Sequence, residues 1–372
     1  MSNPTNQAAY LVDKNVKPLE VRTAPYTPPG PDEIVIRTHA IAINPVDHII
    51  QNLGGMMYTH LPYPEAMLGF DVSGEVVQVG KEVTRFKPGD RVVGEAVGTA
   101  KNRNLASHCG FQLYTVLLPR MTSHIPDTLT YEKASVIPLG LSTAACGLFQ
   151  KDHLALQHPS VPAPKPTGKT LLIWGGSTSV GCNAIQVAVA AGYEVITTCS
   201  PRNFEYVKSL GAVEVYDYNS KTVVKDITRA FKGRVTAGAL SIGAGAADKC
   251  LDILAGCKGD KVLSMATYPT PATPPKRFVM VQTIVTYLSG LISLWIKARR
   301  YGVRSAYIFA DSLVDNEVGP MIYEQWLPKA LAAGTFVPAP KAEVVGHGLG
   351  YIQRAMDINR KGVSAKKIVV TL

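Results

Sequence analysis

The feature that most constrains the fold is an alternation of apolar strands and helices that begins near Leu171. Strand 171–174 runs into a glycine-rich turn and then into an apolar-periodic helix at 180–191. The same order repeats downstream, with strands at 194–198, 213–216, 235–240 and 261–265 and helices at 202–210, 221–231 and 246–255. Strands alternating with helices of about ten residues are typical of a parallel sheet with crossover helices. This part of the chain is therefore predicted to be an α/β domain, a doubly wound parallel sheet of the Rossmann type.

The turn after strand 171–174 has the shape of a dinucleotide-binding loop with one altered position. It reads I-W-G-G-S-T-S-V-G, in which Gly176 and Gly181 match the first and third glycines of G-x-G-x-x-G and Thr178 occupies the second. These glycines allow the tight bend, the close approach of the pyrophosphate and the packing of helix on strand. The amide groups of the helix N-terminus then face the phosphates. We expect a bound dinucleotide, and the alternative is a glycine turn that serves packing only.

The end of the second strand indicates which dinucleotide binds. NAD sites usually carry an acidic residue there, which binds the ribose 2′-hydroxyl. Strand 194–198 instead runs into C-S-P-R-N, without a carboxylate. Ser200 and Asn203 can donate hydrogen bonds, and Arg202 can pair with a 2′-phosphate. The sequence therefore favours NADPH over NADH, although Ser200 can also be an ordinary helix N-cap.

The first third of the chain follows a different pattern. Strands are predicted at 33–42, 72–79 and 90–93, with glycine turns between them. Short strands with turn signals and few helical repeats indicate a small β-rich domain. At the other end of the chain, a helix at 319–333 precedes a closing strand at 367–371. With 372 residues, of which 46% are hydrophobic, the chain is long enough for two domains.

Composition excludes some classes of function. The net charge is +10, but no basic run with interleaved aromatic residues stands out, so a nucleic-acid partner is not expected. The basic surface suits an anionic cofactor, a phosphorylated substrate carrier or an acidic protein. Six cysteines without a C-x-x-C pair argue against a disulfide framework and fit a reducing compartment. The N-terminus lacks the pattern of a signal peptide, so a cytoplasmic location is expected.

One segment could contradict that location. Residues 278–296, F-V-M-V-Q-T-I-V-T-Y-L-S-G-L-I-S-L-W-I, contain no charge and have basic residues on both sides. Their number permits a membrane span. However, six polar or glycine residues lower the hydropathy of the segment. We expect a buried helix that lines a domain interface or an apolar pocket, with membrane contact as the alternative.

Four motifs resemble the medium-chain dehydrogenase/reductase superfamily over nearly the whole chain. They are A-I-N-P-V-D at 42–47, L-G-F-D-V-S-G-E-V-V-Q-V-G at 68–80, F-K-P-G-D-R-V-V-G at 86–94 and K-S-L-G-A-V-E-V-Y-D-Y at 208–218. In addition, G-G-S-T-S-V-G, T-C-S-P-R-N-F and S-A-K-K-I-V-V resemble fungal trans-acting enoyl reductases of highly reducing polyketide synthases. The resemblance implies a GroES-like catalytic domain at 1–137, completed by 311–372, and a Rossmann NADPH-binding domain at 138–310.

The same resemblance implies that the zinc of alcohol dehydrogenases is missing. Zinc-dependent relatives have a cysteine where this chain has Asn44 and G-H-E where it has Gly69-Phe70-Asp71. Their structural zinc lobe carries four cysteines, whereas residues 95–112 contain only Cys109. Zinc needs three or four ligands in a fixed geometry. We therefore predict an enzyme without a metal.

The resemblance also assigns cofactor contacts position by position. The residues implied at the nicotinamide are Val46, Asp47, His48, Met265 and Ala266. Those implied at the pyrophosphate, three of which carry hydroxyls, are Ser177, Thr178, Ser179 and Val180. Those implied around the adenosine 2′-phosphate are Ser200, Arg202, Asn203 and Tyr218. Lys366 and Lys367 belong to a C-terminal strand that is expected to face the cofactor.

Two segments are implied to line an acyl pocket. The predicted substrate-binding residues are Pro138, Leu139, Gly140, Leu141, Ser142, Thr143, Ala144, Thr283, Ile284, Val285, Thr286 and Tyr287. Many relatives have a lysine two residues after the aspartate of N-P-x-D, where this chain has Ile49. The proton donor is therefore left open between His48, Thr143 and water.

These inferences converge on an NADPH-dependent reduction of a carbon–carbon double bond. The expected substrate is an α,β-unsaturated polyketide thioester, held on the carrier domain of a separate polyketide synthase. One alternative is a stand-alone quinone or enone (alkenal) oxidoreductase that acts on a free small molecule. The other is a protein that binds NADPH without catalysis.

Overall fold

The computed structural model describes residues 4–269 and 279–372. Its contacts divide the chain into two compact units. Unit 1 comprises residues 1–140 and 311–372, and unit 2 comprises residues 141–310. Phe278, the first residue of the predicted apolar segment, lies outside the described residues.

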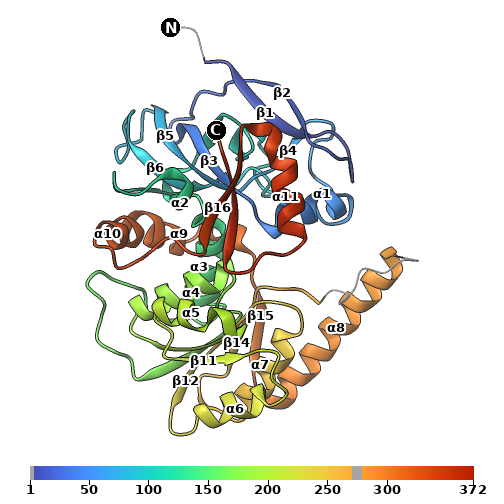
Figure 1. The fold of residues 1–372 in the computed structure, drawn as a ribbon, viewed down its shortest axis with the longest axis vertical. Helices are drawn as coiled ribbons and strands as arrows, with labels where there is room; N and C mark the ends of the chain where they lie inside the picture. The colour runs from blue at the N-terminus through green and yellow to red at the C-terminus, as the bar shows by residue number, and fades with distance from the viewer. Residues whose placement is uncertain (1–3, 270–278) are drawn as a thin grey trace. The chain divides into compact units, whose positions relative to one another are not determined.

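Unit 1 is built on a sheet whose strands come from both ends of the chain (Figure 1). The strand order is β16-β17-β3-β5-β6-β8, and β7 also pairs with β3. These strands are β3 (Ile34–Ala42), β5 (Asp71–Val79), β6 (Arg91–Glu95), β7 (Tyr114–Leu117), β8 (Thr122–His124), β16 (Lys341–His347) and β17 (Lys366–Thr371). A smaller sheet has the order β2-β1-β4, from β1 (Asn6–Leu11), β2 (Glu20–Ala24) and β4 (Ala66–Met67). Because β17 pairs antiparallel with β3, the C-terminal residues complete a sheet that the N-terminal part begins.

The helices of unit 1 are α1 (Pro45–Met57), α2 (Tyr131–Ala134), α9 (Val318–Pro320), α10 (Leu327–Ala332) and α11 (Ile352–Arg360). The helix α3 (Pro138–Phe149) begins in unit 1 and continues into unit 2. The predicted helix at 319–333 consists of α9, a π-helical stretch at Met321–Trp326, and α10. Pro320 and Pro328 lack the amide hydrogen of a regular helix, which accounts for the irregular winding.

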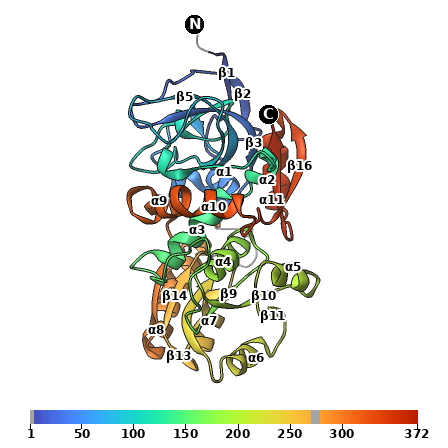
Figure 2. The same ribbon diagram turned by 90° about the vertical axis from the view of Figure 1, so that its left-hand side faces the viewer.

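Unit 2 contains a parallel sheet of the order β11-β10-β9-β12-β14-β15, with β13 paired to β12 (Figures 1 and 2). Its strands are β9 (Lys169–Trp174), β10 (Glu194–Cys199), β11 (Glu214–Asp217), β12 (Val235–Ser241), β13 (Lys258–Gly259), β14 (Val262–Met265) and β15 (Arg304–Tyr307). Its helices are α4 (Ser179–Ala190), α5 (Phe204–Ser209), α6 (Val223–Ala230), α7 (Ala246–Ala255) and α8 (Val279–Tyr301).

The direction of winding reverses between β9 and β12. The chain proceeds outward from β9 through β10 to β11, and then outward on the other side from β12 through β14 to β15. Right-handed crossovers in opposite directions place helices on both faces of the sheet. Ligands of such sheets bind beyond the carboxyl ends of the strands at the reversal. The predicted doubly wound parallel sheet with a second, β-rich part is confirmed.

The expectation of a buried apolar helix at 278–296 is wrong for the described residues. The described residues of this segment belong to α8, and only 6% of the most apolar stretch of that helix is buried. Its exposed large apolar side chains are Val281, Ile284, Val285, Leu288, Ile292, Trp295 and Ile296. One face of α8 packs against α7, and Lys297 forms ion pairs with Asp248 and Asp252 of α7. By length and composition alone, α8 could cross a membrane. Hydropathy identified the helix, but it could not tell that α7 covers only one of its faces.

Candidate active site

The loop after β9 closes through the threonine that replaces the second glycine of the fingerprint. Thr178 is the N-cap of α4, and its Oγ1 accepts a hydrogen bond of 3.0 Å from the Gly181 amide. The same hydroxyl donates to the Gly175 carbonyl at 2.8 Å. The proton of Thr178 is therefore used within the turn. A phosphate at this loop would be bound by backbone amides and the neighbouring hydroxyls rather than by this one.

The two matching glycines are required by close contacts. A Cβ atom on Gly176 would lie 2.2 Å from Oγ1 of Thr197, and a Cβ atom on Gly181 would lie 2.2 Å from the Gly175 carbonyl oxygen. Gly175 itself has φ +94°, a conformation that favours glycine. The loop thus keeps the tight bend and the close helix–strand contact of a dinucleotide cradle. α4 begins directly after this loop, at Ser179, and the N-terminus of a helix favours an anion such as a pyrophosphate.

The residues predicted around a 2′-phosphate follow two neighbouring strands of unit 2. Ser200 and Arg202 come after β10, whereas Tyr218 comes after β11. The Ser200 hydroxyl lies 3.5 Å from the Tyr218 hydroxyl, and Arg202 is exposed while Asn203 is buried. Arg202 forms no ion pair with the described residues. This corner of unit 2 offers hydroxyls and an exposed guanidinium to an anion.

Met265 and Ala266, predicted to flank the nicotinamide, stand at the carboxyl end of β14. The Met265 side chain is buried, and the Ala266 amide donates to the Ser241 carbonyl at 2.9 Å. The other predicted nicotinamide contacts, Val46, Asp47 and His48, lie in the first turn of α1 in unit 1.

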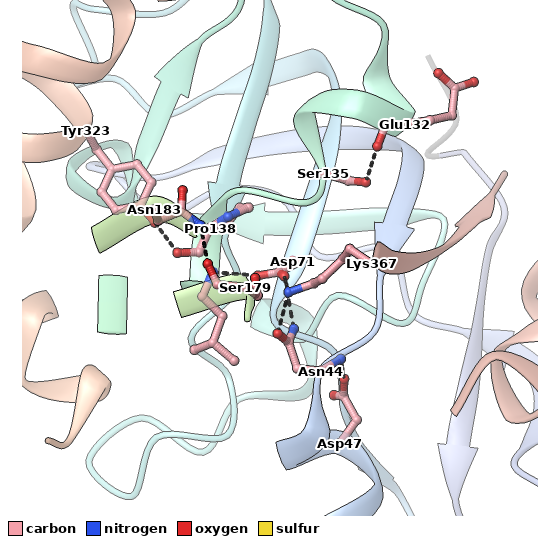
Figure 3. Close-up of polar contacts among 11 residues, drawn as sticks. Asn44, Asp47, Asp71, Glu132, Ser135, Pro138, Ser179, Asn183, Tyr323 and Lys367 are labelled. Atoms are coloured by element: carbon pink, nitrogen blue, oxygen red, sulfur yellow. Dashed lines mark hydrogen bonds and ion pairs between the residues drawn. The ribbon is translucent and has the colours of Figure 1, made fainter. Parts of the chain in front are cut away.

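A buried polar cluster is formed by residues of unit 1 (Figure 3). The Lys367 ammonium is 2.7 Å from Oδ2 of Asp71 and donates to Oδ1 of Asn44 at 2.6 Å. The Asn44 amide group donates to the same Asp71 oxygen at 3.0 Å, and the Leu139 backbone amide donates to the other at 2.7 Å. Asn44, Asp71 and Lys367 are each at most 3% exposed. The ion pair therefore joins β5 to β17, and the hydrogen bonds of Asn44 and Leu139 connect it to the starts of α1 and α3.

Asp47 adds a second carboxyl group to this region. Its Oδ2 accepts a hydrogen bond of 2.7 Å from the Asn44 backbone amide, whereas Oδ1 is buried without a hydrogen-bond partner among the described residues. Burial raises the pKa of Asp47 to about 7, and the negative charge of Asp71 adds to the effect. Asp47 is therefore a carboxyl group that changes its charge near neutral pH.

His48, a predicted catalytic residue, is half-buried on α1. Burial lowers the pKa of His48, and the positive charges of Arg360 and Lys17 lower it further. The imidazole is therefore neutral at pH 7. Thr143, the other predicted catalytic residue, is half-buried on α3.

The two C-terminal lysines have different surroundings. Lys366 is exposed, and its ammonium lies 2.6 Å from Glu343. Lys367 points to the opposite side of β17 and enters the buried cluster. The prediction that this strand faces the cofactor stays a prediction. The ion pair with Asp71 was missed, because the two residues are far apart in sequence and only the alternation of side chains along the strand distinguishes Lys367 from Lys366.

The predicted substrate-binding residues lie on two helices. Pro138 to Ala144 form the first turns of α3, where the Pro138 carbonyl accepts a hydrogen bond of 3.1 Å from the Tyr323 hydroxyl. Residues 283–287 lie on α8, where Ile284 and Val285 are exposed and the remaining three are half-buried. These residues stay predicted pocket residues.

The zinc-ligand positions of alcohol dehydrogenases do not fit a zinc ion in this chain. Asn44 stands where zinc-dependent relatives have a cysteine and Phe70 where they have the histidine ligand, and the Lys367 ammonium already bonds to Asn44 and to the neighbouring Asp71. A buried carboxylate needs one such partner, and a zinc ion would have to displace it. Within residues 4–269 and 279–372, no three His, Cys, Asp or Glu side chains gather as metal ligands.

Known proteins resemble the chain along its whole length. Two family models match it, the alcohol dehydrogenase GroES-like domain at residues 30–127 and the zinc-binding dehydrogenase at residues 179–295. The dehydrogenase pigH of Monascus ruber is 54% identical over 99% of this chain and 100% of its own length. The trans-enoyl reductase himH of Aspergillus japonicus is 35% identical over 100% of this chain and 99% of its own. The predicted resemblance to trans-acting enoyl reductases is confirmed.

Solved structures share the fold. An alcohol dehydrogenase superfamily protein from Novosphingobium aromaticivorans aligns with a TM-score of 0.75 and 24% identity, over 99% of this chain and 100% of that chain. The CurK enoyl reductase aligns with a TM-score of 0.70 and 20% identity, over 98% of this chain and 99% of that chain. At these identities the likeness concerns the fold alone.

Replacing Lys367 with Met should lower the free energy of unfolding by about 3–5 kcal/mol, because it leaves the Asp71 carboxylate buried without its partner. Lys366→Met is the matched control on the same strand. It removes the exposed ion pair between Lys366 and Glu343 and should lower the free energy of unfolding by about 1 kcal/mol or less. Urea unfolding of both variants at neutral pH measures the difference. The double variant Lys367→Met/Asp71→Asn should recover part of the loss. Equal stabilities of the two single variants would contradict this account.

Replacing Asp47 with Asn should change the pH dependence of stability. The pKa of Asp47 is raised in the folded state from 3.8 to about 7, so between these values the folded protein binds more protons than the unfolded one. This residue therefore makes the wild type less stable as the pH rises through that window. Asp47→Asn should gain stability relative to the wild type from pH 4 to pH 7, as measured by urea unfolding at several pH values. A constant difference between the two proteins would refute the raised pKa.

Proposed function

Because the chain belongs to the medium-chain dehydrogenase/reductase superfamily, we propose that it is a trans-acting, NADPH-dependent enoyl reductase of polyketide biosynthesis. Members of this superfamily are oxidoreductases that use a nicotinamide cofactor. The observation that carries the proposal is the Lys367 ammonium on Asn44 and Asp71. Asn44 stands where zinc-dependent relatives have a cysteine, and an ammonium bound to it does not favour a metal ion there, so the chain does not offer that Lewis acid to an alcohol. Reduction of an activated double bond needs no metal.

NADPH, when bound, supplies a hydride to the β-carbon of the unsaturated thioester. The protein must then stabilise negative charge on the thioester oxygen and deliver one proton to the α-carbon. The balance is one hydride and one proton added across the double bond. Since the cofactor supplies the hydride, the protein has to bind and orient both molecules and deliver the proton.

The residues of unit 2 would bind the cofactor. The amides of Ser179 and Val180 would face the pyrophosphate at the start of α4, while the Thr178 hydroxyl keeps the loop closed. Ser200, Arg202 and Tyr218 would surround the 2′-phosphate, with support from Asn203. This arrangement supports the choice of NADPH in our proposal, because an NADH site usually carries a carboxylate at the end of β10.

The proton donor would be water, His48 or Thr143, and water is the donor that we favour. The lowered pKa of His48 argues against an imidazolium donor at neutral pH. A neutral imidazole and a hydroxyl can each hold a water molecule by hydrogen bonds. In this proposal each residue would act by binding water, and neither would have to give up a proton itself.

The substrate would arrive on the carrier domain of a separate synthase. Relatives named trans-enoyl reductases support this partner, and the net charge of +10 suits an acidic carrier domain. The stand-alone quinone or enone oxidoreductase stays the second candidate, since the relative of 54% identity is named only a dehydrogenase. The six cysteines are all free and buried, which supports a cytoplasmic location.

The proposal is tested by following NADPH consumption with crotonyl and longer enoyl thioesters of pantetheine. Turnover of the thioesters, with little turnover of a simple quinone, is expected. Turnover of the quinone alone would move the protein to the second candidate. Binding of NADPH without turnover of any enone or enoyl substrate, carrier-bound substrates included, would leave a protein that only binds the cofactor.

Replacing Arg202 with Ala should raise the KM for NADPH by about ten- to a hundredfold, because a charge-assisted hydrogen bond to the 2′-phosphate is lost. The KM for NADH should hardly change, since NADH has no phosphate there. Arg229→Ala removes another exposed arginine of unit 2, paired with Asp226, and should leave both values unchanged. An equal effect of Arg202→Ala on both cofactors would refute the assigned role.

A further inference from the structure

Four aromatic rings gather where β14 and β15 end. Tyr268 stacks on Tyr307, with ring centroids 4.6 Å apart and planes 12° apart. Tyr287 of α8 and Phe309 lie 6.0 and 5.9 Å from Tyr268, tilted by 45° and 55°. The rings come from the loop after β14, from α8, and from β15 with the residues that follow it. We call these four residues the aromatic cluster.

The aromatic cluster is not a closed part of the hydrophobic core. Phe309 is 65% exposed, and the other three residues are half-buried. The Tyr307 hydroxyl is buried and has no hydrogen-bond partner among the described residues. Burial also raises the pKa of Tyr307 to about 12, so the hydroxyl keeps its proton and can donate. Core packing normally covers a phenyl ring and satisfies a buried hydroxyl, so packing alone leaves both features unexplained.

The aromatic cluster lies beside a residue that is predicted to contact the nicotinamide. In the sheet register Tyr307 is opposite Met265, one of the two residues predicted to flank the nicotinamide. The Ile308 amide donates to the Met265 carbonyl at 2.9 Å, which fixes Phe309 just beyond the carboxyl ends of both strands. An apolar groove of about 420 Å³, lined by Met265, Tyr307 and residues of α8, adjoins the cluster. Ligands of doubly wound sheets bind at this end of the strands.

We propose that the aromatic cluster binds a planar, conjugated part of the substrate, so that the enzyme prefers aryl- or polyene-conjugated enoyl thioesters to those with flexible alkyl chains. This inference rests on the proposed enoyl reduction. Aromatic faces and edges bind flat π-systems by offset or edge-to-face stacking. The cluster contains no charged side chain, and its tyrosine hydroxyls can donate to an oxygen on the substrate. A saturated chain would gain only the burial of apolar surface.

The test compares two thioesters of pantetheine, cinnamoyl and trans-2-hexenoyl, which both carry a trans double bond next to the thioester carbonyl; because the phenyl ring also changes the intrinsic reactivity, the effect is read from the change of their ratio between variants. The wild type should have the higher kcat/KM for the cinnamoyl thioester. Phe309→Leu keeps an apolar side chain but removes the ring, and it should lower the cinnamoyl-to-hexenoyl ratio of kcat/KM by about three- to tenfold. Phe309→Tyr should keep the wild-type ratio. Tyr351→Leu, which removes a ring that is 41% exposed in unit 1, should also leave the ratio unchanged.

The outcomes separate this inference from the proposed function. An unchanged ratio in Phe309→Leu, or an equal fall for both thioesters, would overturn the stacking role. If the wild type reduces neither thioester, enoyl reduction itself fails. The cluster is then judged by calorimetric binding of the same two thioesters in the presence of NADPH. Tighter binding of the cinnamoyl thioester, weakened in Phe309→Leu and kept in Phe309→Tyr, would support the site, and equal binding would refute it.

Discussion

The buried ion pair between Lys367 and Asp71 connects strands from the two ends of the chain in unit 1. Moving an ammonium and a carboxylate out of water costs several kcal/mol for each ion, and their attraction offsets this only when further hydrogen bonds complete both groups. Here Asn44 bonds to both members of the pair, and the Leu139 amide binds the second oxygen of Asp71. The pair can therefore form only when β5, β17 and the starts of α1 and α3 are all in place. This explains why residues 366–371 have to complete the sheet that the first strands of the chain begin.

In the cofactor loop, Thr178 replaces the second glycine of the dinucleotide-binding fingerprint. A glycine at position 178 would let the backbone approach a pyrophosphate most closely. The side chain of Thr178 prevents so close an approach. Its hydroxyl instead accepts a hydrogen bond from the Gly181 amide and donates one to the Gly175 carbonyl. The loop is thereby fixed by its own side chain before any ligand is present. Gly176 and Gly181 cannot be replaced in the same way, because a Cβ on either would overlap its neighbour.

The sequence predicted most of unit 2, because each of its strands and helices carries its own periodicity. Strand 171–174 and helix 180–191, for example, correspond to β9 (Lys169–Trp174) and α4 (Ser179–Ala190). The short edge strands β15 and β16 were missed, since neither has a clear alternation of buried and exposed residues. The exposure of α8 was misjudged, because hydropathy does not tell which neighbour covers a helix. The partner of Lys367 could not be predicted, since it depends on the pairing of strands from opposite ends of the chain.

The charge of the buried centre in unit 1 depends on Asp47. Lys367 and Asp71 cancel one another, so the three groups together are neutral when Asp47 is protonated and carry one negative charge when it is ionised. With the pKa of Asp47 raised to about 7, this change falls within the physiological range. The protonated form leaves no uncompensated charge among these buried groups, whereas the ionised form leaves one, which is costly away from water. Because the Lys367 ammonium neutralises Asp71, the protonation of Asp47 alone decides the net charge of the three groups.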